Sequence, residues 1–239
     1  MMVNINEKEY YMDGYLKENL DYVKPKVLGH NDMMVCIVDG RPGAGKSTMA
    51  TQMAYYLTEG KFSLENMSFT GEKTAEIMNR MGKGDAIIID ESFDQINRRQ
   101  SLSSNNMILL SLLQRMRSKR VFIFILLPYI YDLDKNVILG LADTFLHCYR
   151  QPFGPRGQFT AYDEGGIKKL WLYGRQSYSY DEKITKPNFR ARFTKSFPLD
   201  YDSYEEKKQK SMEDLMQRKP ENQKYKEQRN KLIRKLIEM

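Results

Sequence analysis

Three uninterrupted apolar runs mark the first 130 residues of the chain, and each has the length of a buried β-strand. They cover residues 33–38, 86–89 and 121–127 and consist of large aliphatic and aromatic residues with one cysteine and one alanine. Runs of this kind are typical of central parallel strands whose two faces are both covered by helices. A shorter strand is expected at 67–70. The pattern therefore predicts an α/β fold with a mainly parallel sheet flanked by helices.

The rest of the chain shows weaker patterns. Apolar residues within the first thirty positions give a loose helical face. Short aromatic segments at 158–162, 170–173 and 178–180 are separated by polar residues and glycines, which favours antiparallel strands or hairpins. Beyond position 201 the chain is highly charged, and Pro220 is expected to divide it into two helices. The predicted organisation is an N-terminal helical segment at 1–30, an α/β core at 31–150, a β-rich basic extension at 151–200 and charged C-terminal helices at 201–239.

The first apolar run is followed at once by a complete GxxxxGK[ST] loop. Its glycines allow successive backbone N–H groups to converge on phosphates, because no Cβ blocks the backbone angles or the close approach. The helix expected from Lys46 adds its positive end, the Lys46 ammonium neutralises phosphate oxygens, and the Ser47 hydroxyl suits Mg²⁺. The alternative is a glycine-rich turn without a ligand. The predicted nucleotide-binding residues are Gly40, Arg41, Pro42, Gly43, Ala44, Gly45, Lys46, Ser47 and Thr48.

Two carboxylates end the second apolar run. The run leads into Asp90 and Glu91, about 40 residues after the glycine-rich loop. The end of a parallel strand would place Asp90 beside the loop, where it can hold the water shell of Mg²⁺. Because side chains alternate along a strand, Glu91 would point the other way and serve as the base that activates a water. The alternative is a surface turn that simply begins with two acidic residues.

The order of these features resembles a known division of nucleotide hydrolases. An apolar strand ending in Asp-Glu, a helical stretch at 107–117 and a further strand at 121–127 resemble the additional-strand, catalytic-glutamate division of P-loop NTPases. Within it, the chain is similar to HerA/FtsK-type and zonula occludens toxin-like ATPases of viruses and mobile elements, with 133–136 and 142–150 resembling their last core strand and the approach to it. The likeness covers about residues 30–150. It implies a RecA-like core that binds ATP and Mg²⁺ and hydrolyses ATP to ADP and phosphate.

One position departs from that family. Many relatives end the 121–127 strand with a polar residue that contacts the γ-phosphate, whereas this chain has Leu127 and Pro128. This departure argues against a tightly coupled motor.

Arginines near the two motifs are candidates for a role between subunits. In a ring-forming ATPase, an arginine presented to the γ-phosphate of a neighbour stabilises charge in the transition state. Surface arginines without this role are the alternative for each. The candidates are Arg98, Arg99, Arg115 and Arg117.

Positive charge is concentrated in the C-terminal part. Residues 151–239 contain 20 Lys and Arg against 13 Asp and Glu, whereas residues 1–150 contain 18 of each kind. This asymmetry favours nucleic acid, DNA in particular, as a partner, although Lys- and Glu-rich helices are also common as solvated surfaces. Basic and aromatic residues that alternate between 186 and 197 are suited to contact phosphates and stack bases. The alternative is that the phenylalanines anchor a loop to the core. The residues concerned are Lys186, Phe189, Arg190, Arg192, Phe193, Lys195 and Phe197.

Several other classes of protein do not fit the sequence. No run of 18 apolar residues exists, and the polar first twenty residues do not resemble a secretory signal, so a cytoplasmic protein is expected. Cys36 and Cys148 fall in predicted core strands and are expected to be reduced, buried thiols. His30 and His147 lack neighbours at metal-ligand spacing and are expected to be structural.

The sequence as a whole predicts an oligomeric ATPase that translocates or packages nucleic acid. A second hypothesis is a nucleotide-dependent assembly or regulatory ATPase that does not move DNA. A small-molecule kinase is disfavoured, since Glu91 suits water activation and no arginine-rich lid follows the core.

Overall fold

The computed structural model describes residues 1–90, 110–150 and 157–217. Contacts divide the chain into two compact units, Met1–Tyr201 and Asp202–Met239. The first unit contains the sheet and every element discussed below except α7. Helix α7 (Tyr201–Gln217) begins at the last residue of the first unit and continues into the second.

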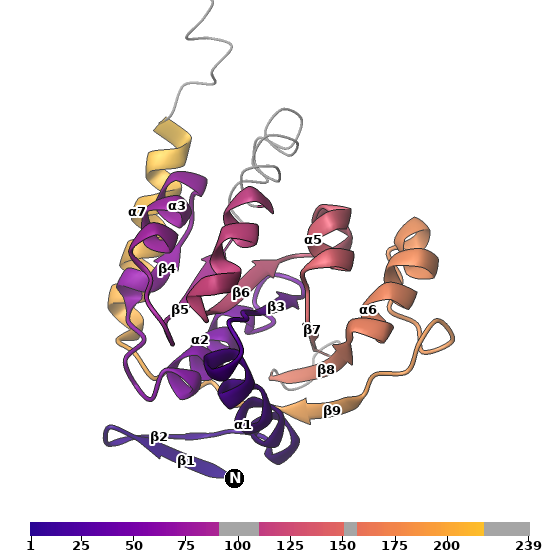
Figure 1. The fold of residues 1–239 in the computed structure, drawn as a ribbon, viewed down its shortest axis with the longest axis horizontal. Coiled ribbons are helices and arrows are strands. Elements are labelled where there is room, and N and C mark those ends of the chain that lie inside the picture. Colours follow the sequence, from indigo (N-terminus) through magenta and orange to yellow (C-terminus); the bar gives the residue numbers. More distant parts are fainter. Residues whose placement is uncertain (91–109, 151–156, 218–239) are drawn as a thin grey trace, which may run out of the picture. The chain divides into compact units, whose positions relative to one another are not determined.

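A seven-stranded sheet forms the centre of the first unit (Figure 1), with the order β4-β5-β6-β3-β7-β8-β9. The five strands from β4 to β7 are parallel, β8 runs antiparallel to β7, and β9 runs antiparallel to β8. This confirms the predicted α/β fold with a mainly parallel sheet. The strands are β3 (Met34–Asp39), β4 (Met67–Ser68), β5 (Ala86–Asp90), β6 (Phe122–Leu127), β7 (Thr144–Tyr149), β8 (Gln158–Asp163) and β9 (Phe189–Arg192).

Helices cover both faces of the sheet. Alternate residues of β3 divide between the faces: Cys36 and Val38 face α2, while Val35 and Ile37 join a large core beneath the opposite helices. The helices on the α2 side are α1 (Gly14–Gly29) and α2 (Lys46–Leu57), and those on the other side are α3 (Gly71–Arg80), a helical stretch at 110–116, α5 (Lys135–Gly140) and α6 (Glu164–Lys169). Short helical turns are η1 (Leu64–Asn66), η3 (Arg117–Lys119), η4 (Ile130–Asp132), the π-helical η5 (Leu170–Gly174) and η6 (Arg175–Ser177).

The first eleven residues form a hairpin instead of the expected helix. Strand β1 (Met2–Ile5) pairs with β2 (Lys8–Tyr11) through a turn at Asn6 and Glu7, whose φ angles are 50° and 65°. A two-residue hairpin loop of type I′ has positive φ at both positions, and asparagine adopts it readily. Helix α1 begins only after Asp13, whose carboxylate accepts the N–H groups of the first turn.

Residues 164–177 are helical, which corrects the predicted strand at 170–173, and residues 178–180 follow as a turn and irregular segment instead of the predicted strand. Asp163 accepts the Gly166 N–H at 2.8 Å and so caps α6, which continues into η5 and η6. Burial follows a helical pattern, because Leu170 and Trp171 are buried together while the two residues after them are exposed. A strand would alternate at every position. Only β8 and β9 realise the antiparallel pairing expected for this region.

Both cysteines are free and buried, as expected. Burial raises the pKa of each thiol well above its ordinary value. Within the described part of the chain, every helix is too short or too polar to cross a membrane.

Candidate nucleotide-binding site

The glycine-rich loop connects the carboxyl end of β3 to the amino end of α2. At Gly40, φ is 143° and an added Cβ would lie 2.2 Å from the carbonyl oxygen of Cys148. Gly45 caps α2 with a φ of 98°, and an added Cβ there would lie 2.7 Å from two ring atoms of Phe193. Gly43 also has positive φ. The structure thus shows why side chains are excluded at these positions, and it leaves the N–H groups at the start of α2 at the mouth of the loop.

Lys46 lies across this loop. Its side chain is largely buried, and Nζ donates to the carbonyl oxygens of Gly40 at 2.6 Å and Arg41 at 3.4 Å. An ammonium held at the amino end of a helix adds positive charge where the helix dipole is already positive. This combination favours an anion such as a nucleotide phosphate.

Ser47 and Asp90 lie together although 43 positions separate them, and the Ser47 Oγ is 3.4 Å from Asp90 Oδ2. Strand register explains the approach. Asp90 is in register with Leu126, which is in register with Val38, so Asp90 points to the same face as α2. Asp90 is only 3% exposed. A hydroxyl and a buried carboxylate side by side are oxygen ligands of the type that Mg²⁺ prefers.

The remaining predicted site residues fall into two groups. Glu91, Arg98 and Arg99 lie outside the described residues. Arg115 is exposed on the 110–116 helix, and Arg117 lies 3.6 Å from Asp32, just before β3 begins. Arg117 therefore lies at the amino ends of the parallel strands, whereas the loop lies at their carboxyl ends. A six-residue strand separates the two by about 20 Å, at the usual rise per residue.

A buried polar cluster under the loop was not anticipated as part of the site. Asp39, the last residue of β3, is fully buried and accepts the Ile130 N–H at 2.8 Å. Its carboxylate also pairs with His147 Nδ1 at 2.7 Å and accepts a hydrogen bond from the Tyr180 hydroxyl. The Gly40 N–H donates to Pro128 O at 3.3 Å. The segment after β6 is therefore joined to the start of the glycine-rich loop.

The tyrosine of this cluster stays protonated. Burial, followed by the charge of Asp39, raises the pKa of the Tyr180 hydroxyl, so it donates to the carboxylate throughout the physiological pH range. Its ring stacks on His147 with 4.2 Å between centroids. His147 is thus structural, as expected, but it supports the residue that precedes the loop. The sequence feature that could have indicated this cluster is Asp39 itself, a charged residue that directly extends an apolar strand.

The segment after β9 crosses α2. The Gln52 side chain donates to the carbonyl oxygens of Thr194 and Ser196, at 3.0 and 2.6 Å. Lys8 Nζ donates to Pro198 O at 2.6 Å. Together with the contact between Phe193 and Gly45, these bonds hold residues 193–198, which we call the strap, against the loop and its helix.

The phenylalanines of this region contact other aromatic rings of the fold, and Phe189 and Phe197 are half-buried. Phe193 is 8% exposed. Phe189 contacts Phe159 and Tyr15, and the ring of Phe197 contacts that of Tyr201. The alternative interpretation, that these rings anchor the segment to the core, is therefore what the structure supports.

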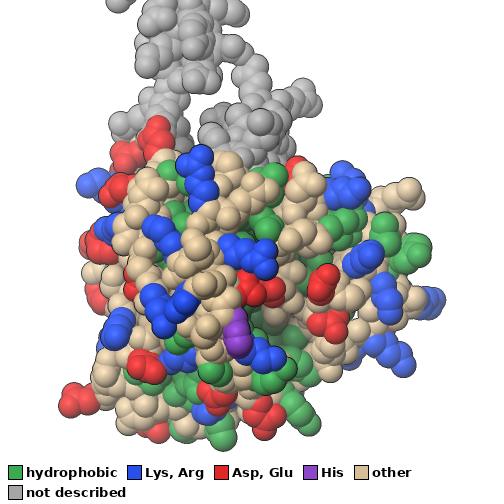
Figure 2. All heavy atoms as spheres, in the orientation of Figure 1, with side chains coloured by type: hydrophobic (Ala, Val, Ile, Leu, Met, Phe, Trp, Pro, Cys, Tyr) green, Lys and Arg blue, Asp and Glu red, His purple; other side chains and the backbone are tan. Residues whose placement is uncertain are grey.

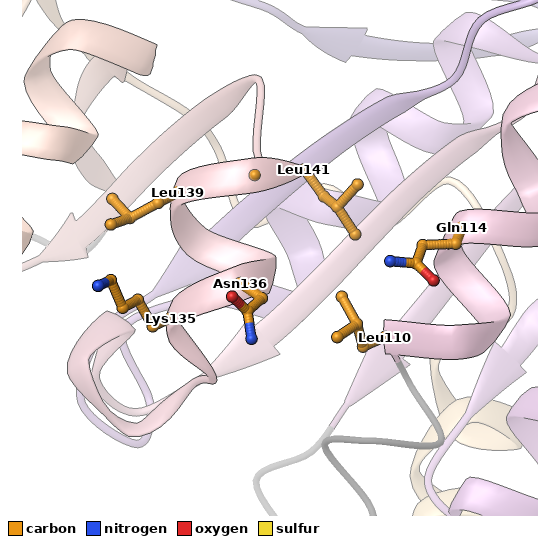
Figure 3. A pocket seen from close by; sticks show the side chains of 7 residues that line it. Leu110, Gln114, Lys135, Asn136, Leu139 and Leu141 are labelled. Atoms are coloured by element: carbon orange, nitrogen blue, oxygen red, sulfur yellow. The ribbon is translucent and has the colours of Figure 1, made fainter.

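A separate groove of about 360 Å³ lies between the 110–116 helix and α5. Leucines line part of it and polar side chains the rest (Figure 3). No lining residue belongs to the glycine-rich loop or is Asp90, so this groove is distinct from the nucleotide site. The lining residues are Leu110, Gln114, Lys135, Asn136, Leu139, Gly140 and Leu141.

Comparisons with known proteins place these features in context. The family model of nSTAND3, described as Novel STAND NTPase 3, matches residues 26–144. No curated protein matches the chain.

Solved structures are similar at low identity. The N-terminal domain of zonular occludens toxin from Neisseria meningitidis is 17% identical, with a TM-score of 0.43, over 73% of this chain and 98% of that one. The DNA-packaging ATPase B204 from Sulfolobus Turreted Icosahedral Virus is 15% identical, with a TM-score of 0.39, over 57% of this chain and 94% of that one. The genome packaging NTPase B204 of Sulfolobus turreted icosahedral virus 2, solved with AMP, is 15% identical, with a TM-score of 0.29, over 64% of this chain and 87% of that one.

The glycine-dependent loop and the approach of Ser47 to Asp90 have the arrangement of a P-loop nucleotide-binding site, and both lie within the residues that match the NTPase family model.

Proposed function

We propose that the chain hydrolyses ATP and uses the energy to translocate or package nucleic acid, DNA in particular, as an oligomer of a virus or mobile element. The observation that carries the hydrolytic part is the convergence of Lys46, Ser47 and Asp90 on one end of the sheet. The nucleic-acid part is supported by the net charge of +7, all of which comes from residues 151–239.

The residues present fit a nucleoside triphosphate with Mg²⁺. Backbone N–H groups of residues 40–48 and the Lys46 ammonium would bind the phosphates, and Ser47 and Asp90 would hold the metal ion directly or through water. The metal would supply charge neutralisation on the phosphate oxygens. We assign to Glu91 the orientation of the attacking water and the acceptance of its proton, as the water oxygen bonds to the γ-phosphorus and the bond to the bridging oxygen breaks to release ADP.

The strand order supports the additional-strand division. Strand β6 lies between β3, which leads into the loop, and β5, which ends at Asp90. The loop and Asp90 thus follow two strands, β3 and β5, that are not neighbours in the sheet, and the end of β6 lies between them.

A second candidate is a nucleotide-dependent assembly or regulatory ATPase that does not move DNA. It is favoured by the end of β6, where Leu127 is buried in the core and presents no polar group to a γ-phosphate. In this chain, the segment after β6 is joined to the loop through Pro128 O and the Asp39 carboxylate.

ATP hydrolysis separates these candidates. Phosphate release would be measured for the wild type, Lys46→Ala and Glu91→Gln, each with and without single- and double-stranded DNA, over a range of protein concentration and salt. A motor predicts turnover that rises with DNA and with protein concentration and is lost in both variants. Weak turnover that ignores DNA, with ATP still bound, would reject the motor in favour of the assembly module. If the wild type binds no ATP, both fail.

A further inference from the structure

An exposed surface of cations and apolar side chains follows the helical stretch from α6 to η6. Leu172, Tyr173 and Tyr178 are 56%, 70% and 50% exposed, and Lys168 and Lys169 are exposed beside them. We call these five residues the α6 surface. Figure 2 shows Lys or Arg side chains next to hydrophobic ones over this part of the molecule. Exposed apolar side chains that lie together and are bordered by polar residues are a common feature of interaction sites.

The helical geometry brings the cations and the apolar groups together. Lys168 and Leu172 are four residues apart, as are Lys169 and Tyr173, so each pair lies on one face about one turn apart. The opposite face holds Ile167, which is buried in the core. The α6 surface is thus set on an anchored helix.

The charges around this surface are mixed, since the Asp132 carboxylate accepts a hydrogen bond from the Tyr178 hydroxyl at 3.3 Å, but cations predominate beside Tyr173. Arg175 lies over the Trp171 ring, 4.4 Å from its centroid, and adds a third cation. Glu164 lies at the start of α6, more than one turn before Tyr173. Glu182 is paired with Arg190 and so does not offset the lysines. The helix carboxyl end, where both lysines lie, is where cations are favoured.

Other exposed tyrosines of the first unit have rings that are already covered. The Tyr22 ring has the Lys26 ammonium 3.6 Å from its centroid, and the Tyr15 ring packs against Phe189. Among the described residues, no ring contact involves Tyr173. An open aromatic face beside two lysines offers the two kinds of contact that single-stranded nucleic acid uses, base stacking and phosphate binding.

Tyr178 connects this surface with the nucleotide site. Its ring meets Tyr129 and Tyr131 edge-on, with centroids 5.6 and 5.5 Å apart, and Tyr131 stacks on Tyr180 at 5.3 Å. Tyr180 in turn bonds Asp39, next to the glycine-rich loop. A surface that holds nucleic acid would therefore be in packed contact with the residues that support the loop.

We propose that the α6 surface is a binding site for single-stranded nucleic acid, with a base stacked on Tyr173 and phosphates held by Lys168 and Lys169. This inference rests on the proposed nucleic-acid function and names the surface that performs it. It replaces the phenylalanines between 189 and 197, whose rings are packed, as the stacking element.

The test is equilibrium binding of a fluorescein-labelled single-stranded oligonucleotide to the full chain by anisotropy, without ATP. Tyr173→Ala is expected to weaken binding about tenfold, since stacking of one base contributes roughly 1–3 kcal/mol. Tyr173→Phe keeps the ring and should bind like the wild type. The double variant Lys168→Ala, Lys169→Ala should lower the slope of log affinity against log salt by about 1.4, at about 0.7 for each phosphate on a single strand.

Tyr22→Ala is the matched control, because this tyrosine is also exposed on a helix but is covered by a lysine. Thermal melting and ATP hydrolysis without DNA verify folding of each variant. If the wild type binds the oligonucleotide and Tyr173→Ala binds equally well, the proposed surface is wrong while the nucleic-acid function stands. If the wild type does not bind the oligonucleotide, the proposal of a nucleic-acid partner is itself rejected. Concentration-dependent self-association that Tyr173→Ala abolishes, with oligonucleotide binding unchanged, would reassign the surface to a protein interface.

Discussion

The contact between the strap and the glycine-rich loop gives a quantitative prediction for Gly45→Ala. An alanine there would keep a φ of 98°, which lies in the left-handed region, and its Cβ would lie 2.7 Å from the Cε2 and Cζ atoms of Phe193. Holding an alanine in this left-handed backbone conformation costs about 1–2 kcal/mol. Forcing an extra carbon into a packed contact adds about 1–3 kcal/mol. We therefore expect Gly45→Ala to lower the free energy of unfolding by about 2–5 kcal/mol, and part of that loss depends on the Phe193 ring.

Phe193→Leu separates the two terms, because leucine lacks both ring atoms that the new Cβ would meet. In urea unfolding followed by circular dichroism, Gly45→Ala should cost about 1–3 kcal/mol less in the Phe193→Leu background than in the wild type. Gly71→Ala is the control, since no atom lies within 4 Å of an added Cβ there and no positive φ occurs. If the loss from Gly45→Ala is the same in both backgrounds, the ring contact is not what excludes a side chain at this position.

Three further predictions concern the groups around the loop. Asp39→Asn should lower the free energy of unfolding in urea by about 1–3 kcal/mol, because the amide puts donors where the carboxylate now accepts hydrogen bonds; an unchanged midpoint would contradict this. Gln52→Ala should lower it by about 1–2 kcal/mol and speed amide hydrogen exchange in the strap, while unaltered exchange would show that these bonds do not hold it. Asp163→Ala should cost about 1 kcal/mol at pH 7 by removing the cap of α6, as measured by thermal unfolding. The Gly166 N–H holds the pKa of Asp163 below its ordinary value of 3.8, so this contribution is present at neutral pH and lost as pH falls through the folded-state pKa; Asp163→Asn should remove that pH dependence.

The parts of the site that sequence predicts are those fixed by local pattern and strand direction. The glycine spacing defines the loop. Because the strands are parallel, an apolar strand that ends at Asp90 brings that carboxylate to the carboxyl ends of the strands, where the loop also lies. The approach of Ser47 to Asp90 follows from these two facts and from the alternation of side chains along β5.

The parts that sequence does not predict depend on contacts between distant segments. Asp39 meets Tyr180 across 141 positions, and the Gln52 side chain reaches a strap 142 positions away. Neither pairing has a local signature. The N-terminal hairpin escaped prediction because Asn6 and Glu7 do not form the Asn-Gly pair that marks a two-residue turn. The helical stretch at 164–177 was concealed by glycines that usually mark turns.

The two edges of the sheet limit how copies of this chain can associate. At one edge β4 is only two residues long, and at the other β9 carries Arg190 and Arg192 in a four-residue strand. Short strands and charged residues are the devices by which natural sheets prevent another chain from adding to an open edge. Continuous sheets running from one molecule to the next are therefore disfavoured. An assembly of this chain would have to be joined through helices and loops, whose contacts can loosen and re-form during the proposed reaction cycle without breaking a shared ladder of backbone hydrogen bonds.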